Sequence, residues 1–204
     1  MIKYHQVKEA ANQLLIYQKK LDTKFDVREM KFKDHNIIFD SLQNYAEISG
    51  LPLNILLHDK NSPIRDGLRI YLPDQNLHLI LYNDDICCQE RLRFTLAHEI
   101  GHVILCHDKD CDIAELEADC FAAQLLSPWF TIKMLGNVAK PTALQLSSIF
   151  QISVSAANRR ISDVHRSFYK LTDTDKMVYD MQKEQVHRIY SETYRQVRRE
   201  AVYV

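Results

Sequence analysis

The sequence predicts an α+β protein in which a small mixed three-stranded sheet packs with helices and a helical region follows. Two runs with strand-like composition, Leu68–Leu72 and Leu77–Tyr82, are joined by the turn-forming residues PDQN at 73–76. The residues after this hairpin carry apolar side chains at helical spacing, and the pattern is helical beyond Pro128. The strands are therefore expected before residue 83, and helices after it.

The residues before the hairpin are predicted to form two helices and one strand. Apolar residues recur at helical spacing over 7–21, and a second helix is expected around Ile37–Ser49, ended by Gly50. Leu53–His58 is predicted to be a short strand, and 59–67 a loop. The expected order of elements is therefore α-α-β-β-β-α-α.

A helical segment after the hairpin contains the pattern H-E-x-x-H. His98 and His102 are four residues apart, so on a helix both imidazoles leave the same side, one turn apart. This is the spacing of two ligands of a tetrahedral zinc ion. Glu99 lies about 100° around the helix from His98, where a general base belongs.

The rest of this helix is expected to pack against a core. An apolar stripe lies opposite the histidines and consists of Leu92, Leu96, Ile100 and Val103. Gly101 costs about 1 kcal/mol against Ala inside a helix, which predicts that another element packs closely against its backbone. Asp84 or Asp85 is expected to cap the helix.

A third metal ligand is expected from a second helix, Ile113–Leu126. Glu115 and Asp119 are i and i+4 and share one face, whereas Glu117 points about 200° away from Glu115. We expect Glu115 to bind the metal and Asp119 to accept the N–H of a ligand histidine. Glu117 is the alternative ligand.

Three other features of this region bear on the site. The longer three-histidine motif of metzincins is excluded because Leu105 and Asp108 replace its glycine and its last histidine. His107 is expected on the core side of the helix, in a structural role. The nearby cysteines are expected to be buried packing residues, namely Cys106, Cys111 and Cys120.

The residues after Pro128 predict a helix-turn-helix-like pair. Thr142–Arg160 contains one helix, a turn at Gln151-Ile152, and Ser153 as the N-cap of the next helix. We favour packing on the rest of the chain over DNA contact by Arg159, Arg160 and Arg166, because few basic residues occur there. Residues 174–201 predict an amphipathic helix that docks on the body of the protein, with a homodimer as the alternative.

Composition limits the class of protein. The net charge of −1 over 204 residues gives no general attraction to nucleic acid or to a membrane surface. The amphipathic N-terminal segment does not have the pattern of a signal peptide, and no apolar run has the length of a membrane span. The five cysteines lack disulfide-like spacing, which fits a reducing compartment. We expect a cytoplasmic protein without membrane contact.

Two segments resemble the ImmA/IrrE family of zinc metallopeptidases: RLRFTLAHEIGHVILCH at 91–107 and ELEADCFAAQLLSP at 115–128. The resemblance is strong over Asp84–Pro128 and weaker over the hairpin and the helix-turn-helix-like segment. Ser127 departs from the pattern, because the family usually has Met there. Carried over to matching positions, the resemblance makes His98, His102 and Glu115 the metal ligands and Glu99 the catalytic base.

The resemblance also implies a fold and a function. It implies a zincin-like fold, and we expect that metallopeptidase domain over 1–135, followed by a helix-turn-helix-like segment over 136–166. An amphipathic C-terminal helix is expected over 167–204, where the resemblance is absent. It implies one catalytic Zn²⁺, a site that Mn²⁺ would also fit. The protein would come from a bacterium or phage, and its substrate or partner would be a helix-turn-helix repressor. Loss of that repressor would switch on stress or mobile-element genes.

The chemistry expected is hydrolysis of a peptide bond. The metal polarises the scissile carbonyl, and Glu99 takes a proton from water and passes it to the leaving nitrogen. Tyr71 and Tyr82 are candidate oxyanion donors, with Arg69 as a further candidate. The strand before the H-E-x-x-H helix is expected to pair with substrate through a free edge. The alternative is a non-proteolytic regulatory protein, an anti-repressor or DNA-binding module with a structural metal.

Overall fold

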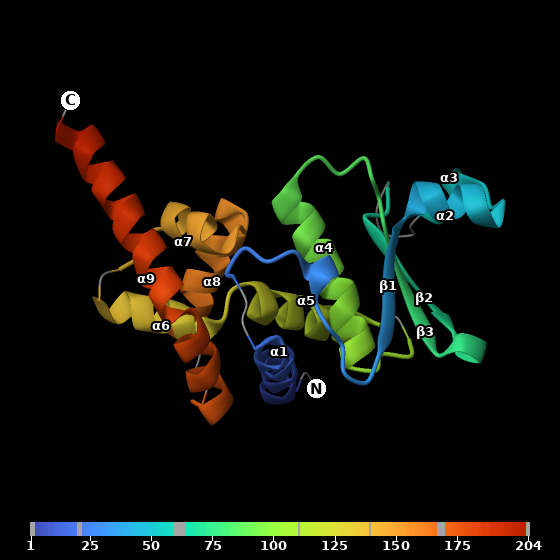
Figure 1. The fold of residues 1–204 in the computed structure, drawn as a ribbon, viewed down its shortest axis with the longest axis horizontal. Coiled ribbons are helices and arrows are strands. Elements are labelled where there is room, and N and C mark those ends of the chain that lie inside the picture. The colour runs from blue at the N-terminus through green and yellow to red at the C-terminus, as the bar shows by residue number, and fades with distance from the viewer. Residues whose placement is uncertain are drawn as a thin grey trace. The chain divides into compact units, whose positions relative to one another are not determined.

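The computed structural model confirms the α+β fold and its small mixed three-stranded sheet (Figure 1). It describes residues 3–19, 22–58, 64–109, 111–138, 140–166 and 170–202. The elements, in chain order, are α1 (Tyr4–Tyr17), η1 (Val27–Glu29), β1 (Asn36–Ser41), α2 (Leu42–Ser49), α3 (Leu53–Leu57), β2 (Gly67–Leu72), η2 (Pro73–Gln75), β3 (Leu77–Tyr82), α4 (Gln89–Ile104), α5 (Asp112–Leu126), α6 (Trp129–Val138), α7 (Ala143–Phe150), α8 (Val154–Arg166) and α9 (Asp173–Val202).

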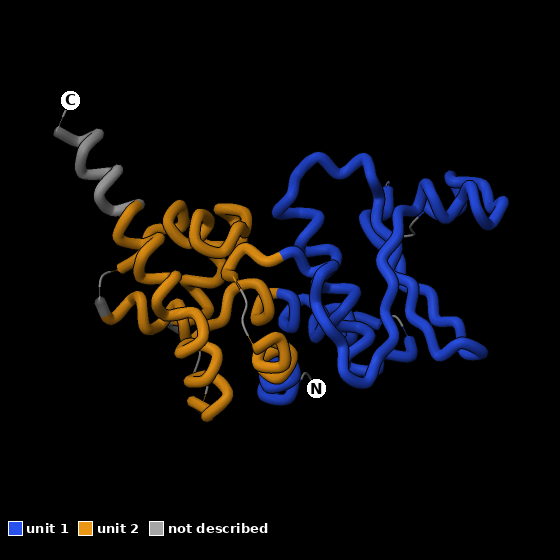
Figure 2. Tube along the Cα trace, in the orientation of Figure 1, with its two compact units in different colours: residues 1–10, 26–122 blue, residues 11–25, 123–204 orange. Residues whose placement is uncertain are grey.

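The chain divides into two compact units, coloured separately in Figure 2. Unit 1 consists of Met1–Ala10 and Asp26–Ala122, and unit 2 of Ala11–Phe25 and Ala123–Val204. The sheet and the H-E-x-x-H helix belong to unit 1, and the C-terminal helices belong to unit 2.

The sheet has the strand order β1-β3-β2, with β1 parallel and β2 antiparallel to β3. The predicted hairpin is confirmed: η2 turns the chain, and Asn76 takes a left-handed backbone with φ of 46°. β3, the strand before α4, is the central strand of the sheet. The expectation that this strand offers a free edge is therefore wrong, because β1 and β2 pair with its two sides. β2 is the edge strand that packs against α4.

Two of the predicted elements before the hairpin are wrong. Ile37–Ser41 lies in strand β1, and only the following residues form the helix α2. Ser41 begins that helix by accepting a hydrogen bond from Asn44 N, and Gly50 ends it as expected, with φ of 71°. The predicted strand Leu53–His58 is instead the short helix α3, which follows Pro52 and packs against α2. The predicted order of elements fails for this reason.

The remaining N-terminal predictions concern α1 and the loop. α1 begins three residues before the predicted helix and ends at Tyr17. Residues 20–21 of the predicted helix, and 59–63 of the predicted loop, lie outside the described residues.

Helix α4 packs on β2 and β3, beside the sheet in Figure 1. Its predicted apolar stripe is buried, since each of the four side chains is at most 8% exposed. A β-carbon built on Gly101 would lie 3.1 Å from Phe121 Cδ1 and 3.3 Å from the backbone of Ala118. The predicted close packing is thus provided by α5. The expected aspartate cap is wrong, because the N-cap residue is Cys88 and it makes no side-chain capping bond.

In unit 2, the helix-turn-helix-like pair has the predicted form. Thr142 and Gln145 form a capping box at the start of α7, and Gln151 has a left-handed backbone at the turn. Ser153 accepts a hydrogen bond from Ala156 N at the start of α8. α9 packs on α6 and α7 through an apolar face that includes Val178, Val186 and Tyr190. Among its described side chains, α9 therefore has the amphipathic pattern that the sequence predicts.

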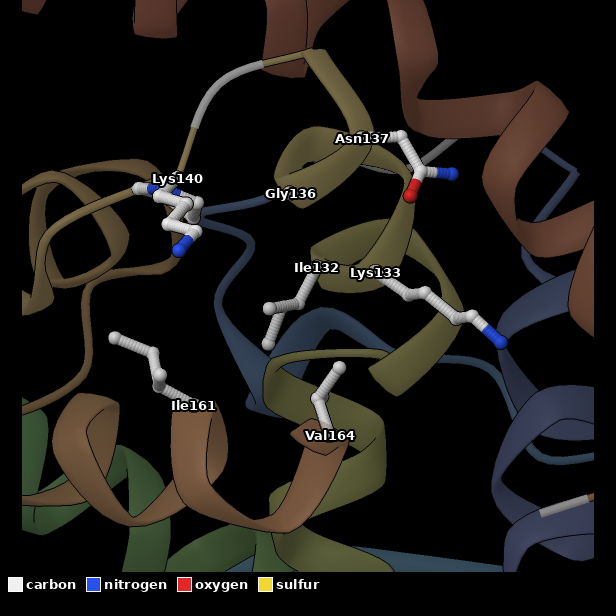
Figure 3. Close-up of a pocket in the computed structure, with 8 residues that line it drawn as sticks. Ile132, Lys133, Gly136, Asn137, Lys140, Ile161 and Val164 are labelled. Atoms are coloured by element: carbon white, nitrogen blue, oxygen red, sulfur yellow. The ribbon is translucent and has the colours of Figure 1, made fainter. Parts of the chain in front are cut away.

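A pocket of about 570 Å³ lies in unit 2 and is lined from α6, α8 and the connection after α6 (Figure 3). Ile132, Ile161 and Val164 are apolar residues of its lining, and Lys133 and Lys140 are basic ones. None of its described lining residues is a His, Cys, Asp or Glu, so it offers no protein ligands of the type that zinc prefers. Across the described helices, none combines the length and the apolar character that crossing a membrane requires.

Candidate metal centre

Three predicted ligand side chains meet in unit 1. His98 Nε2 lies 3.0 Å from His102 Nε2, and a carboxylate oxygen of Glu115 lies 3.3 Å from the first and another 3.5 Å from the second. The structure thus brings together His98, His102 and Glu115, as the spacing of the residues predicts. Within the described part of the chain, this is a group of His, Cys, Asp or Glu side chains whose ligand atoms could hold a metal ion.

The size of this cluster fits a zinc ion. Tetrahedral coordination with bonds of about 2.0–2.2 Å places neighbouring ligand atoms about 3.3–3.6 Å apart. His98 Nε2 lies 3.3 Å from one oxygen of Glu115 and His102 Nε2 lies 3.5 Å from the other, while the two nitrogens, 3.0 Å apart, are slightly closer than that range. Two imidazoles and one carboxylate also leave a coordination position open, as catalytic zinc sites require. The residues present therefore fit a catalytic metal ion.

Helix geometry positions the ligands. His98 and His102 lie one turn apart on α4, and α5 carries Glu115 against them. The small residue Gly101 permits this approach, because a side chain at that position would meet α5 at 3.1–3.3 Å. The close contact between α4 and α5 thus requires glycine at residue 101, and the same contact brings Glu115 to the two histidines.

Asp119 lies where the sequence predicts an outer partner for a ligand histidine. Its Oδ1 atom is 2.9 Å from His98 Nδ1, while His98 Nε2 faces His102 and Glu115. Burial lowers the pKa of His98, but the hydrogen bond to Asp119 and the negative charges of the nearby carboxylates outweigh it. The pKa of His98 is therefore raised above its ordinary value of 6.5. Asp119 orients the ring and increases its basicity.

His102 is more buried than a ligand in an open cleft would be, with 5% of its side chain exposed. Burial, together with the positive charges of His98 and His107, lowers its pKa to about 3. His102 is therefore neutral at physiological pH, and a neutral imidazole is the form that binds metal.

Glu99, the predicted base, lies on the side of α4 that faces the start of β2. A β-carbon built on Gly67 would lie 3.4 Å from Glu99 Oε1 and 2.6 Å from Thr95 Cγ2. Gly67 thus lets the edge strand approach the helix at the position of this carboxylate. The charge of Glu99 also contributes to the raised pKa of His98.

Two residues lie beside the cluster, namely His107 and Glu117. His107 lies beyond the end of α4 rather than on its core side, and its Nδ1 atom is 3.0 Å from His102 Nδ1. Glu117, the alternative ligand, has an oxygen 3.2 Å from His107 Nε2 and does not join the three-residue cluster. The link between His107 and His102 is a feature that sequence reasoning missed.

The candidate oxyanion donors make other contacts. Tyr71 stacks on His78, and its hydroxyl group donates to Asn76 at the hairpin turn. The guanidinium of Arg28 lies over the ring of Tyr82, 5.8 Å from its centre. Arg69 Nη2 donates to the backbone oxygen of His107 at 2.7 Å. Arg69 is thus hydrogen-bonded to a residue that contacts the cluster through His102.

Two further expectations are corrected or refined. Cys106 and Cys111 are exposed and Cys120 is partly exposed, so the expectation of buried packing cysteines is wrong. Arg160, considered for DNA contact, is only 7% exposed and donates to the backbone oxygen of Ser127 and to Gln124 Oε1. Arg159 is exposed, and the side chain of Arg166 lies outside the described residues.

Comparison with known proteins places this site in a family. The sequence model described as Peptidase_M78, IrrE N-terminal-like domain, matches residues 51–162, which is 112 of the 204 residues. The matched segment runs from α3 to α8 and contains the whole His98, His102 and Glu115 cluster. A search among curated proteins found no match. Because this family model matches more than half of its length, the chain belongs to the IrrE N-terminal-like family of metallopeptidases.

Proposed function

We propose that this chain is a zinc-dependent endopeptidase that cleaves a specific protein, a helix-turn-helix transcriptional repressor. The observation that carries the proposal is the cluster of His98, His102 and Glu115 with Glu99 on the same helix. Two histidines and one carboxylate with an adjacent glutamate are the parts that metal-assisted peptide hydrolysis needs.

Each residue has a distinct role in this proposal. His98, His102 and Glu115 would hold the ion, which when bound supplies a Lewis acid that polarises the scissile carbonyl and acidifies water. Glu99 accepts a proton from the attacking water and delivers it to the leaving amide nitrogen. Asp119 keeps the ring of His98 aimed at the cluster through its 2.9 Å hydrogen bond.

The substrate would bind in an extended form along β2. Within the described residues β2 is an edge strand, and its first residue, Gly67, lies against Glu99. A peptide that pairs with the free side of β2 would use the unpaired backbone groups of that strand for affinity. It would also carry its backbone past the side of α4 where Glu99 lies.

The identity of the substrate rests on the resemblance of residues 91–128 to ImmA/IrrE peptidases. A repressor substrate would place the chain in the cytoplasm, where relief of repression would switch on stress or mobile-element genes. A helix-turn-helix protein encoded by a neighbouring reading frame is the first substrate to test.

The test compares wild-type chain, Glu99→Gln and Glu47→Gln, each loaded with zinc. Glu47 is an exposed residue of α2 and serves as the matched control. Each protein is incubated with the candidate repressor and with a proteome-derived peptide library, and products are identified by mass spectrometry. Wild type and Glu47→Gln should cleave. Glu99→Gln should retain zinc and cleave about 10²–10⁴ times more slowly, the usual contribution of a general base.

The same variants separate proteolysis from binding in cells. If Glu99→Gln relieves repression as well as wild type does, the protein acts as a non-proteolytic anti-repressor and the endopeptidase proposal is wrong. If neither wild type nor Glu47→Gln cleaves the repressor while both cleave library peptides, the peptidase stands and the repressor is not its substrate.

A further inference from the structure

The metal-binding cluster continues into a chain of hydrogen-bonding groups behind His102. His102 Nδ1 lies 3.0 Å from His107 Nδ1, and His107 Nε2 lies 3.2 Å from Glu117 Oε2. The other oxygen of Glu117 accepts a hydrogen bond from the backbone nitrogen of Lys3 at 3.0 Å. The chain therefore runs from a metal ligand, through a second histidine, to an anchored carboxylate.

The backbone after α4 holds His107 in this place. Cys106 has a left-handed backbone with φ of 54°, so the chain turns back sharply at the end of the helix. The nitrogens of Cys106 and His107 then donate to Val103 O and His102 O, the pair of bonds that defines a Schellman motif. Arg69 fixes the turn from the side of β2 by donating to His107 O.

The three side chains are shielded from solvent. The exposed fractions are 5% for His102, 10% for His107 and 15% for Glu117. A buried imidazole N–H without a partner would cost about 1–3 kcal/mol. Water has little access to replace a missing partner here, so the hydrogen bonds within the chain decide the orientation of the rings.

The positions of the nitrogens allow one assignment of protons. His102 Nε2 faces His98 and Glu115, so this atom must be free of its proton when it binds a metal. The neutral ring then carries its proton on Nδ1, which faces His107. His107 Nδ1 must accept that proton's hydrogen bond, and its own proton belongs on Nε2, directed at Glu117.

We infer that His107 and Glu117 are positioning residues that orient His102 and fix its tautomer for metal binding. This inference rests on the proposed function, because it assumes that His102 is a ligand. Each ligand histidine is then oriented by a carboxylate. His98 is hydrogen-bonded directly to Asp119, whereas His102 is linked to Glu117 through His107. Neither His107 nor Glu117 needs to touch the substrate.

The variants that test the inference remove the imidazole of His107 with both of its hydrogen bonds, or alter a single partner. His107→Leu fills a similar volume without an acceptor, whereas His107→Asn places an amide oxygen near the position of Nδ1. Glu117→Gln keeps an acceptor for His107 and removes its charge. His78→Leu is the matched control, since His78 lies on β3 of the same unit and stacks on Tyr71.

The first measurement is zinc affinity of the full chain, by competition with a chromophoric chelator. His107→Leu should bind zinc about 10–100 times more weakly than wild type, the usual effect of losing an outer partner of a ligand histidine. His107→Asn and Glu117→Gln should lose less than His107→Leu, and His78→Leu should match wild type. The cobalt-substituted proteins should show altered visible absorption bands in His107→Leu and wild-type bands in His78→Leu.

The second measurement needs no variant and so remains decisive if His107→Leu fails to fold. Nitrogen-15 spectra of the imidazoles in the zinc-loaded wild type should place the proton of His107 on Nε2 and that of His102 on Nδ1. A proton on His107 Nδ1, or equal zinc affinity for His107→Leu and wild type, would overturn the inference while leaving the proposed peptidase intact. A wild type that takes up no zinc would overturn both.

Discussion

A β-carbon on Gly67 would lie 2.6 Å from Thr95 Cγ2, closer than carbon atoms approach in folded proteins. Gly67 begins the edge strand β2, and Thr95 lies one turn before Glu99 on α4. The β-branched side chain of Thr95 has two favoured rotamers on a helix, so relief of this contact requires a change of rotamer or a shift of the strand. The contact between the edge strand and the helix of the predicted base therefore depends on the absence of a side chain at residue 67.

Gly67→Ala should slow peptide hydrolysis while leaving zinc affinity within a few-fold of wild type. The added methyl group forces β2 and α4 apart near Glu99, and a displacement of about 1 Å can cost a hundredfold in rate. Steady-state kinetics on a peptide identified by library cleavage, beside a zinc titration, make the comparison. Thr95→Ser removes the opposing methyl group, so the double variant should recover much of the activity. An unimpaired Gly67→Ala would mean that this contact does not position the base.

Gly101→Ala should lower the free energy of unfolding by up to about 2 kcal/mol. An alanine gains about 1 kcal/mol of helix propensity, but its methyl group would meet Phe121 and the backbone of Ala118 at 3.1–3.3 Å. Overpacking of this kind costs typically 1–3 kcal/mol, and a backbone atom cannot rotate aside. Gly136→Ala, in α6, is the control: nothing lies within 4 Å of its added carbon, so it should stabilise the protein by up to about 1 kcal/mol. Denaturant unfolding of the metal-free variants measures both, and a stabilised Gly101→Ala would contradict the packing argument.

Arg160→Ala should destabilise unit 2 by about 2–4 kcal/mol. Arg160 is buried and makes three hydrogen bonds to Ser127 O and Gln124 Oε1, and an unpaired buried acceptor costs about 1–3 kcal/mol. Arg159→Ala, at the neighbouring exposed position, should change stability by less than about 0.5 kcal/mol. Thermal unfolding of the two variants gives the comparison. Equal stability of the two would show that Arg160 does not hold the helices of unit 2 together.

Zinc affinity should fall as the pH is lowered through the pKa of His98. In the metal-free protein that pKa is raised above 6.5, so zinc must displace a proton from His98 at and below this pH. His102, with a pKa of about 3, holds no competing proton in this range. Calorimetry in buffers of different ionisation enthalpy should therefore find about one proton released from the histidines per zinc near pH 6.

Asp119→Asn provides the matched variant for this pH dependence. It removes a carboxylate that raises the pKa of His98, so the decline in zinc affinity should begin at a lower pH than in wild type. It should also weaken zinc binding about 10–100-fold at pH 7.5. Two results would contradict the assignment of the raised pKa to His98. One is the release of two histidine protons per zinc in wild type, and the other is a zinc affinity that declines over the same pH range in Asp119→Asn as in wild type.

The candidate site was predictable where helix geometry alone determines it. The four-residue spacing of His98 and His102, and of Glu115 and Asp119, defines faces that persist in the folded protein. His107 was not predictable in the same way, because its place depends on a left-handed backbone at Cys106. Glycine, the residue that usually marks such a turn, is absent there. The sequence feature that could have indicated a partner for His107 is Glu117, whose carboxylate lies on a different face of α5 from Glu115.

The sheet was less predictable than the helices around the site. Ile37–Ser41 has β-branched and aromatic residues that fit a strand. It runs directly into an apolar helix, however, and a single helical pattern covers both segments. Its pairing with β3 is a contact between distant segments, which local composition does not encode. Leu53–Leu57 is short enough that its apolar run fits either a strand or a buried helix.

The central claim is that one metal ion binds between His98, His102 and Glu115. A crystal structure of the zinc-loaded protein, with anomalous diffraction collected on both sides of the zinc absorption edge, tests it most directly. We predict one strong zinc peak per chain, about 2.0–2.2 Å from His98 Nε2, His102 Nε2 and a carboxylate oxygen of Glu115. A peak coordinated by Glu117 in place of Glu115, or no zinc between the two histidines, would contradict the account.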